Sequence, residues 1–290
     1  MAETIICAVD DSEAAVRVLD TARGLAAALA TDLLVVHAGA TQRGWDWAGA
    51  SVRAQLAEAG ELPEVRLVDG SPAEAILKEA DREGAEFVVV GSRGRGRLRS
   101  GLLGSVSREL ASRARCPVVI VPSGAHWTGA GGDVGDVKAS VVCGVDGSDQ
   151  ALAAAAFAGR LATRLDCRLV VVHARQNLRA MAAYPGASMS TPPVTGQDDA
   201  VERQAAEVVK EAGGMAGVNA EFLVEPGPPT EVLESVADRE AARLIVIAAR
   251  GVGGLRAALL GSVAAELPAA AAQPVVVLSA PAAEATRAGH

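Results

Sequence analysis

A glycine-rich loop, residues 91–107, holds the groups in this chain that are best suited to bind a ligand. It follows an apolar run, contains four arginines, and leads into a helical pattern through Gly104 and Ser105. Glycines let backbone N–H groups approach an anion closely, and a helix that begins at this point adds unpaired N–H donors and the positive end of its dipole. The loop therefore predicts a cradle for the phosphates of a nucleotide. For a glycine-rich loop on its own, a mobile surface connection is the alternative.

An acidic turn, Asp10-Asp11-Ser12, follows the first apolar run of the chain. The carboxyl ends of parallel strands meet at one edge of a sheet, so we expect this turn to lie beside the glycine loop. The Asp10 carboxylate is suited to accept hydrogen bonds from ribose hydroxyls or to help hold a cation. Asp11 or Ser12 is suited to cap the next helix.

Short β-branched runs must position these two loops. They occupy residues 5–9, 33–37, 65–68, 87–90 and 118–121. Between them, the apolar residues Ala14, Val18, Leu25 and Leu29 lie at helical spacing, and Ala75, Ile76, Glu79 and Ala80 suggest another helix. Nearly continuous apolar strands that are separated by helices indicate a parallel sheet covered on both faces. We expect an α/β fold, a doubly wound sandwich with a mostly parallel five-stranded sheet, whose ligands bind where the strand order reverses.

The chain repeats this pattern. Asp10 and His37 recur as Asp146 and His173, an offset of 136 residues, and Gly104 recurs as Gly261, an offset of 157. The sequence therefore predicts two tandem domains, residues 1–123 and 137–281, joined by a flexible glycine-rich linker at 124–136. The 21 extra residues of the second copy are assigned to a loop around Tyr184, and the tail at 282–290 is expected to fray.

On these residues the chain resembles a tandem universal stress protein. The ATP-binding pattern of that family is Gly, two residues, Gly, nine residues, Gly and then Ser or Thr, and Gly91, Gly94, Gly104 and Ser105 match it. Ala8 precedes Asp10 by two residues, as in the family, and a final apolar strand led by proline is present at 117–121. The resemblance covers both copies, which is nearly the whole chain outside the linker and tail.

The resemblance implies an ATP site, with Mg²⁺ expected to accompany the nucleotide. In the first copy it implies that Ala8, Asp10 and Ala38 line the adenosine end of ATP. It also implies phosphate contacts from Gly91, Gly94, Gly104, Ser105 and Val106, with Ser107 nearby. The corresponding residues of the second copy are Gly144, Asp146, Ala174, Gly251, Gly261, Ser262 and Val263.

The loop arginines Arg93, Arg95, Arg97 and Arg99 are placed to contact phosphate, although each is equally well explained as part of a solvated charged loop. Only Arg250 and Arg256 correspond to them in the second copy. The second copy also has Ala248, Ala249 and Ala264 in place of Gly91, Ser92 and Ser107. A methyl group restricts the backbone, and each lost hydroxyl removes a hydrogen-bonding partner. We therefore expect the first site to bind nucleotide more tightly than the second.

Catalytic signatures are weak. A phosphate-loop lysine next to serine or threonine is absent from the sequence, which excludes a Walker-type ATPase. His37 and His173 end equivalent strands, and a structural role is favoured over acid–base chemistry because neither has an evident carboxylate or nucleophile beside it. Trp45 and Trp47 are equally suited to stacking on a base and to packing within their loop.

We therefore expect a stress-response regulator or sensor that binds ATP, rather than a turnover enzyme. A slow ATPase or a protein that phosphorylates itself on Ser105 or Ser107 is the alternative from the enzyme class. A second alternative is an interaction scaffold that binds no nucleotide, or binds a cyclic or monophosphate form.

Composition and charge limit the kinds of binding partner and the cellular location that we expect for this protein. A net charge of −8 and a pI near 5.1 argue against nucleic acid as a binding partner. The sequence has neither a signal peptide pattern nor an apolar run long enough to span a membrane, so we expect a cytoplasmic protein. The four cysteines lack metal-ligand spacing and are expected to be free, buried thiols. The final strands, 118–121 and 275–278, are expected to pair with each other within the chain. A homodimer and an unidentified protein partner are left open.

Overall fold

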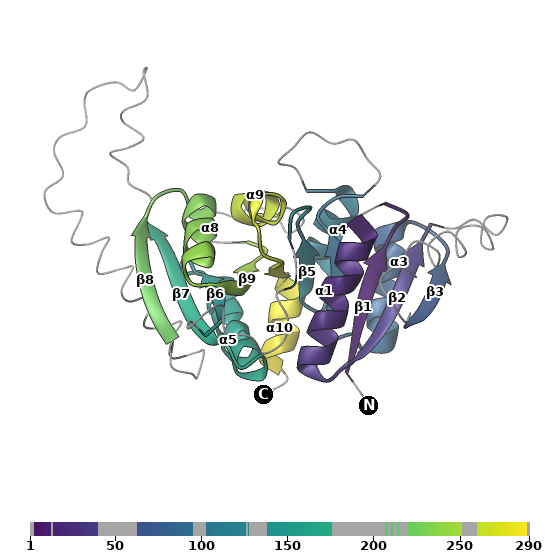
Figure 1. Ribbon diagram of the computed structural model, residues 1–290, viewed down its shortest axis with the longest axis horizontal. Coiled ribbons are helices and arrows are strands. Elements are labelled where there is room, and N and C mark those ends of the chain that lie inside the picture. The colour runs from purple at the N-terminus through teal and green to yellow at the C-terminus, as the bar shows by residue number, and fades with distance from the viewer. Residues whose placement is uncertain are drawn as a thin grey trace, which may run out of the picture.

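A computed structural model describes residues 3–12, 14–39, 63–94, 103–125, 127, 138–175, 207, 210, 214, 220–250 and 260–288, with side chains to 285. In the first half the elements are β1 (Thr4–Val9), α1 (Ala14–Leu29), β2 (Asp32–Ala38), β3 (Glu64–Val68), α3 (Pro72–Glu83), β4 (Phe87–Gly91), α4 (Ser105–Arg113) and β5 (Val118–Val121). In the second half they are β6 (Ser140–Gly144), α5 (Asp149–Arg164), β7 (Arg168–Arg175), β8 (Ala220–Pro226), α8 (Pro229–Arg239), β9 (Ala242–Ala248), α9 (Ser262–Ala270), β10 (Val275–Leu278) and α10 (Ala280–Ala288). Strands and helices alternate as predicted, which confirms the α/β fold (Figure 1).

One sheet of ten strands runs through both halves, in the order β3-β2-β1-β4-β5-β10-β9-β6-β7-β8. The pairs within each half are parallel, whereas β5 and β10 pair antiparallel, with Val119 opposite Val276. The two final strands thus cover each other's edges and join two five-stranded sheets into one. The strand order reverses between β1 and β4 in the first half and between β6 and β9 in the second.

Helices cover both faces of the sheet, which is why the central strands are apolar throughout. Helices α1 and α5 pack on one face, around buried residues such as Leu25 and Leu161. Helices α3, α4, α8 and α9 pack on the other, around residues such as Leu110 and Leu267. A strand with water on one face would alternate apolar and polar side chains, whereas every residue of 5–9 is buried and apolar.

Contacts between the halves extend beyond the strand pair. The ring of Phe87 in β4 meets the ring of Phe157 in α5 edge to face, with centroids 5.9 Å apart. Arg164, near the end of α5, forms ion pairs with Glu86 and with Glu3, the latter at 3.1 Å. One apolar cluster therefore includes residues of both halves.

The described residues of the linker and the tail pack more closely than the sequence predicted. Ala125 is fully buried, and the indole of Trp127 lies so close to Gly24 in α1 that a Cβ there would be 2.1 Å from its Cδ1. The tail forms α10, which contacts α5 and α4 and buries Ala282, so the expectation that it frays from 282 is wrong. Alanine has the highest helix propensity, and its small side chain allows close packing between helices.

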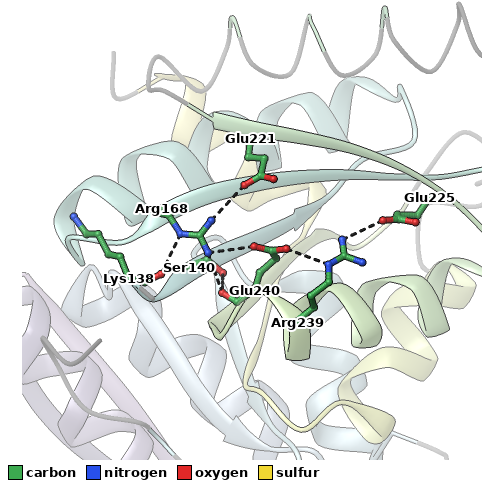
Figure 2. Close-up of polar contacts among 7 residues, drawn as sticks. All are labelled: Lys138, Ser140, Arg168, Glu221, Glu225, Arg239 and Glu240. Carbon is green, nitrogen blue, oxygen red and sulfur yellow. Dashed lines mark hydrogen bonds and ion pairs between the residues drawn. The ribbon is translucent and has the colours of Figure 1, made fainter. Parts of the chain in front are cut away.

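A network of charged groups holds the edge of the second half where its strands begin (Figure 2). Arg168 at the start of β7 donates to the Lys138 carbonyl at 3.1 Å, and pairs with Glu240 at 3.2 Å and Glu221 at 3.3 Å. The Ser140 hydroxyl donates to the Glu240 carbonyl at 2.8 Å, which ties β6 to the end of α8. These groups satisfy one another at the edge opposite the carboxyl ends of the strands, so we assign them a structural role.

Candidate functional site

A cavity of about 380 Å³ lies at the carboxyl ends of β1 and β4, where the strand order of the first half reverses. It is bounded by the ends of three strands and by parts of α1, α3 and α4. The structure brings together all the site residues predicted for the first half: Ala8, Asp10, Ala38, Gly91, Arg93, Gly94, Gly104, Ser105, Val106 and Ser107. Residues more than 90 positions apart in the sequence therefore share one cavity, as the doubly wound topology requires.

Sequence reasoning missed several walls of this cavity. They are Val9, Ser12, Ala14, Ala15, Val18, Gly39, Pro72, Ile76 and Val90. Most are apolar and belong to helix faces or strand ends, where a residue that lines a cavity has the same pattern as one that packs in the core. Pro72 begins α3, directly after the loop that follows β3. Its place after the carboxyl end of a strand was the one signal in the sequence that could have assigned it to the edge of the sheet where the cavity lies.

The Asp10 carboxylate is held in a fixed direction beside the glycine loop. Its Oδ1 accepts hydrogen bonds from the Ser12 backbone N–H at 3.0 Å and from the Ser12 hydroxyl at 2.5 Å. On its other side, a Cβ on Gly94 would lie only 2.5 Å from Oδ2. The loop can approach Asp10 this closely because residue 94 has no side chain.

Two further bonds fasten the ends of the loop. The buried Ser107 hydroxyl donates to the Gly91 carbonyl at 2.6 Å, and the Gly104 N–H donates to the Ser92 carbonyl at 2.9 Å. These bonds hold the start of α4 against the end of β4. Because Ser107 is buried and its proton is already donated, its oxygen is poorly placed to act as a nucleophile, whereas Ser105 is exposed at the start of α4.

Positive groups converge on the cavity. Arg93 lines it, and the Nε of Arg93 is buried with no hydrogen-bond partner in the part of the chain that the structure describes. Helix α4 begins at Ser105 with Gly104 as its N-cap, and no side chain caps its first turn. An uncapped helix N-terminus and the positive charge of a guanidinium group both favour an anionic partner.

The second half reproduces part of this arrangement. Asp146 accepts from the Ser148 N–H at 3.1 Å and from its hydroxyl at 2.7 Å, as Asp10 does from Ser12. The Gly261 N–H donates to the Ala249 carbonyl at 2.8 Å, which corresponds to the bond at Gly104. Gly144 ends β6, Ala174 lies in β7, and α9 begins at Ser262 and Val263, so the predicted residues that the structure describes take equivalent positions.

The second half differs at the three alanines. Ala264 is buried where Ser107 lies in the first half, so no hydroxyl holds the end of β9. Ala248 takes the place of Gly91, where in the first half a Cβ would be 3.1 Å from the carbonyl oxygen of Arg93. A loop that follows the path of the first half would therefore crowd this methyl group.

Both histidines have the structural role that the sequence favoured. Nδ1 of His37 lies 3.0 Å from the carbonyl oxygen of Val9, and Nδ1 of His173 lies 3.0 Å from that of Val145. Each bond joins the end of the first strand in its half to the neighbouring strand.

Several predicted residues lie outside the described part of the chain: Trp45, Trp47, Arg95, Arg97, Arg99, Tyr184, Gly251 and Arg256. The cysteines are free, as predicted, and Cys7, Cys116 and Cys143 are buried, whereas Cys167 is only half-buried, so the expectation of a buried thiol is wrong at that position. Burial raises the pKa of the Cys116 and Cys143 thiols to about 12, which keeps both protonated at neutral pH.

Among the described residues, no group of three or more His, Cys, Asp or Glu side chains is arranged to hold a metal ion. None of the described helices has the length and apolar character that crossing a membrane requires.

Comparison with known proteins agrees with this architecture. The chain matches the universal stress protein family over residues 1–122 and 139–279. Universal stress protein Rv2005c of Mycobacterium tuberculosis is 33% identical over 217 residues, which span 73% of this chain and 67% of that protein. A universal stress protein of Thermus aquaticus is 36% identical over 137 residues, or 42% of this chain and 99% of its own length.

Among solved structures, a universal stress protein of Archaeoglobus fulgidus is similar over 96% of this chain and 99% of its own, with a TM-score of 0.60 and 17% identity. This likeness supports the tandem α/β fold. The family model matches two segments of the chain, and the strands and helices follow one another in the same order in both halves. Both observations agree with the tandem arrangement that the resemblance in the sequence predicted. The chain belongs to the universal stress protein family and carries two copies of the family's domain.

Proposed function

We propose that the cavity of the first half binds ATP and that the protein is a nucleotide-dependent stress-response regulator. The observation that carries this proposal is that Arg93 and the uncapped start of α4 line one cavity. A guanidinium group and the positive end of a helix dipole at one cavity favour an anion. The phosphates of ATP would supply that anion.

The shape of the site supports a nucleotide rather than a small anion alone. A volume of about 380 Å³ is within the usual range for small-molecule sites, and the wall formed by Ala8, Ala38 and Ile76 is apolar. We assign the adenosine end of ATP to this wall and the phosphates to Gly91, Gly94, Gly104 and Ser105. Val106 and Ser107 would complete the phosphate end.

Mg²⁺ is proposed to enter with the nucleotide rather than to be held by a protein metal site. Asp10 supplies the one carboxylate among the described residues that line the cavity, and Ser12 already occupies its Oδ1. Oδ2 is left to accept a ribose hydroxyl or to share a cation with the phosphates. Mg²⁺ commonly binds through one or two carboxylates and substrate phosphates, so this donor set fits it.

Regulation is favoured over turnover because the described residues around the cavity lack a paired nucleophile and base. Ser107 donates to the Gly91 carbonyl, and His37 donates to the Val9 carbonyl. In the proposed mechanism, bound nucleotide orders the glycine loop and thereby changes the surface offered to a protein partner. A slow ATPase or a protein that phosphorylates itself is the second candidate, and the exposed Ser105 at the start of α4 is the observation that favours it.

The test combines mass spectrometry of nucleotide carried by freshly purified protein with calorimetric titration of ATP, with and without Mg²⁺. Gly104→Val is the disruptive variant because a Cβ at 104 would already lie 3.3 Å from the Ser92 carbonyl oxygen. Gly124→Val is the matched control, since a Cβ there meets nothing within 4 Å. We expect wild type and Gly124→Val to bind ATP and Gly104→Val to lose binding. Metal-dependent release of ADP or a phosphoserine would favour the enzyme candidate, and no binding under any condition would favour the scaffold.

A further inference from the structure

The same hydrogen bond occurs in both halves, at equivalent positions. The Nδ1 to carbonyl oxygen distance is 3.0 Å for His37 and Val9, and also 3.0 Å for His173 and Val145. A carbonyl oxygen can only accept, so Nδ1 carries the proton in each ring. Although the two halves differ at several loop residues, this bond is the same in both.

The bonded carbonyl belongs to the peptide unit that precedes Asp10. Val9 is opposite His37 in the parallel pairing of β1 and β2, and it is the last residue of β1. A peptide unit is planar, so holding the Val9 oxygen also fixes the direction of the Asp10 N–H and restricts where the Asp10 side chain can point. The imidazole therefore acts on the backbone from which the Asp10 carboxylate projects.

A second anchor then acts on the carboxylate itself. Ser12 binds Oδ1 through two donors, and Oδ2 is left facing Gly94 and the cavity. His37 and Val9 are both buried, which makes their bond stronger and its loss more costly than at an exposed site. The two anchors together determine the position of Oδ2 relative to the glycine loop.

We propose that His37 is a positioning residue for ligand binding: its Nδ1–H holds the peptide before Asp10 so that Oδ2 meets the ligand. This inference rests on the proposed ATP site, since the ligand in question is ATP. In the second half, the His173 bond makes the same backbone arrangement at Asp146. His37 is not a proton donor to the ligand in this account, because its Nδ1 proton is committed to Val9.

Calorimetric titration of ATP into single and double variants tests the proposal. His37→Leu removes the donor, and we expect ATP to bind about tenfold more weakly, because a displaced Asp10 carboxylate would lose its hydrogen bond to the ligand. His37→Asn keeps an N–H donor near the Nδ1 position and should recover most of the affinity. In an Asp10→Ala background, His37→Leu should change affinity less than about twofold, because two residues that act through one contact are not additive.

A stability control separates positioning from a general loss of folding. Ser140→Ala removes another buried side-chain bond to a backbone carbonyl, at the opposite edge of the second half, and should lower the melting temperature without changing ATP affinity. His37→Leu with wild-type affinity, or with a loss that adds fully to that of Asp10→Ala, would overturn the proposal. So would failure of His37→Asn to recover binding while it folds normally.

Backbone amide NMR of the free protein gives a readout that does not depend on ATP. The amide signals of Asp10, Ser12 and Gly94 should shift in His37→Leu and return toward wild type in His37→Asn. The amides of Asp146 and Ser148 should respond in the same way to His173→Leu. If wild type binds no ATP, the proposed function fails, and these shifts still decide the positioning role: unmoved signals in His37→Leu would overturn it.

Discussion

The carboxyl ends of the two halves share a frame but differ in the groups that line it. Both keep an aspartate held by a serine two residues later, a histidine bonded to the preceding carbonyl, and a glycine N–H that closes the loop. The first half adds Gly91 and Ser107 where the second has Ala248 and Ala264. The hydrogen bonds that fix the backbone around the two sites are therefore shared, whereas the side chains that line the sites differ.

The largest effect is expected at Arg93, the cation that lines the first cavity. Arg93→Ala should weaken ATP binding about 10- to 100-fold, because hydrogen bonds to charged groups contribute about 1.5–3 kcal/mol. Arg250→Ala, at the equivalent position of the second half, is the matched control and should leave the tighter binding event nearly unchanged. Calorimetric titration measures both. An Arg250 effect as large as that of Arg93 would contradict the proposed difference between the halves.

Exchanging Gly91 and its counterpart Ala248 tests directly whether the residues that line the two sites set their affinities. Gly91→Ala places a Cβ about 3.1 Å from the Arg93 carbonyl oxygen, so the loop must move, and we expect about tenfold weaker ATP binding. The reverse change, Ala248→Gly together with Ala249→Ser and Ala264→Ser, should strengthen binding in the second half. The calorimetric stoichiometry should then rise toward two per chain. Unchanged affinity in both variants would mean that these residues do not distinguish the halves.

A smaller effect is expected from the hydroxyl that closes the first loop. Ser107→Ala leaves the Gly91 carbonyl without its side-chain donor, which should cost about 1 kcal/mol of unfolding free energy and weaken ATP binding a few-fold. Ala264 shows that the same fold accepts alanine at this position in the second half. Denaturant unfolding and titration measure the two effects separately. An intact affinity would limit Ser107 to a role in stability.

The smallest effect is expected at the opposite edge, in the network of Figure 2. Burial raises the pKa of Glu240, but the ion pairs with Arg239 and Arg168 outweigh it, so the net pKa lies below that of an unfolded glutamate. Its stabilising contribution is therefore present above the unfolded pKa of about 4.3 and is lost as the pH falls through the folded value. Arg168→Ala should cost about 1 kcal/mol at pH 7 and reduce the loss of stability in acid, with ATP affinity unchanged. A change in affinity would show that this edge is coupled to the cavity.

Local pattern predicted most of the fold and much of the site. Apolar runs and helical spacing identified all five strands of the first half and the helices α1 and α3, because each element's burial repeats with its own geometry. Glycine spacing identified the residues that approach the cavity, since a close approach requires the missing side chain wherever the loop folds back. The internal repeat predicted the second copy and the three alanines at which it departs.

Contacts between distant segments were decided only by the tertiary structure. Nothing local marks Pro72 and Ile76 as walls of the cavity, Trp127 as the partner of Gly24, or α10 as a packed helix rather than a frayed tail. Likewise, sequence indicates that Arg93, Ser107 and His37 are polar but not which of them already has a partner. Hydrogen bonding and burial depend on neighbours that the fold brings from far along the chain. Those neighbours distinguish the hydroxyl of Ser107 and the imidazole of His37, which have hydrogen-bond partners, from the Nε of Arg93, which has none among the described residues.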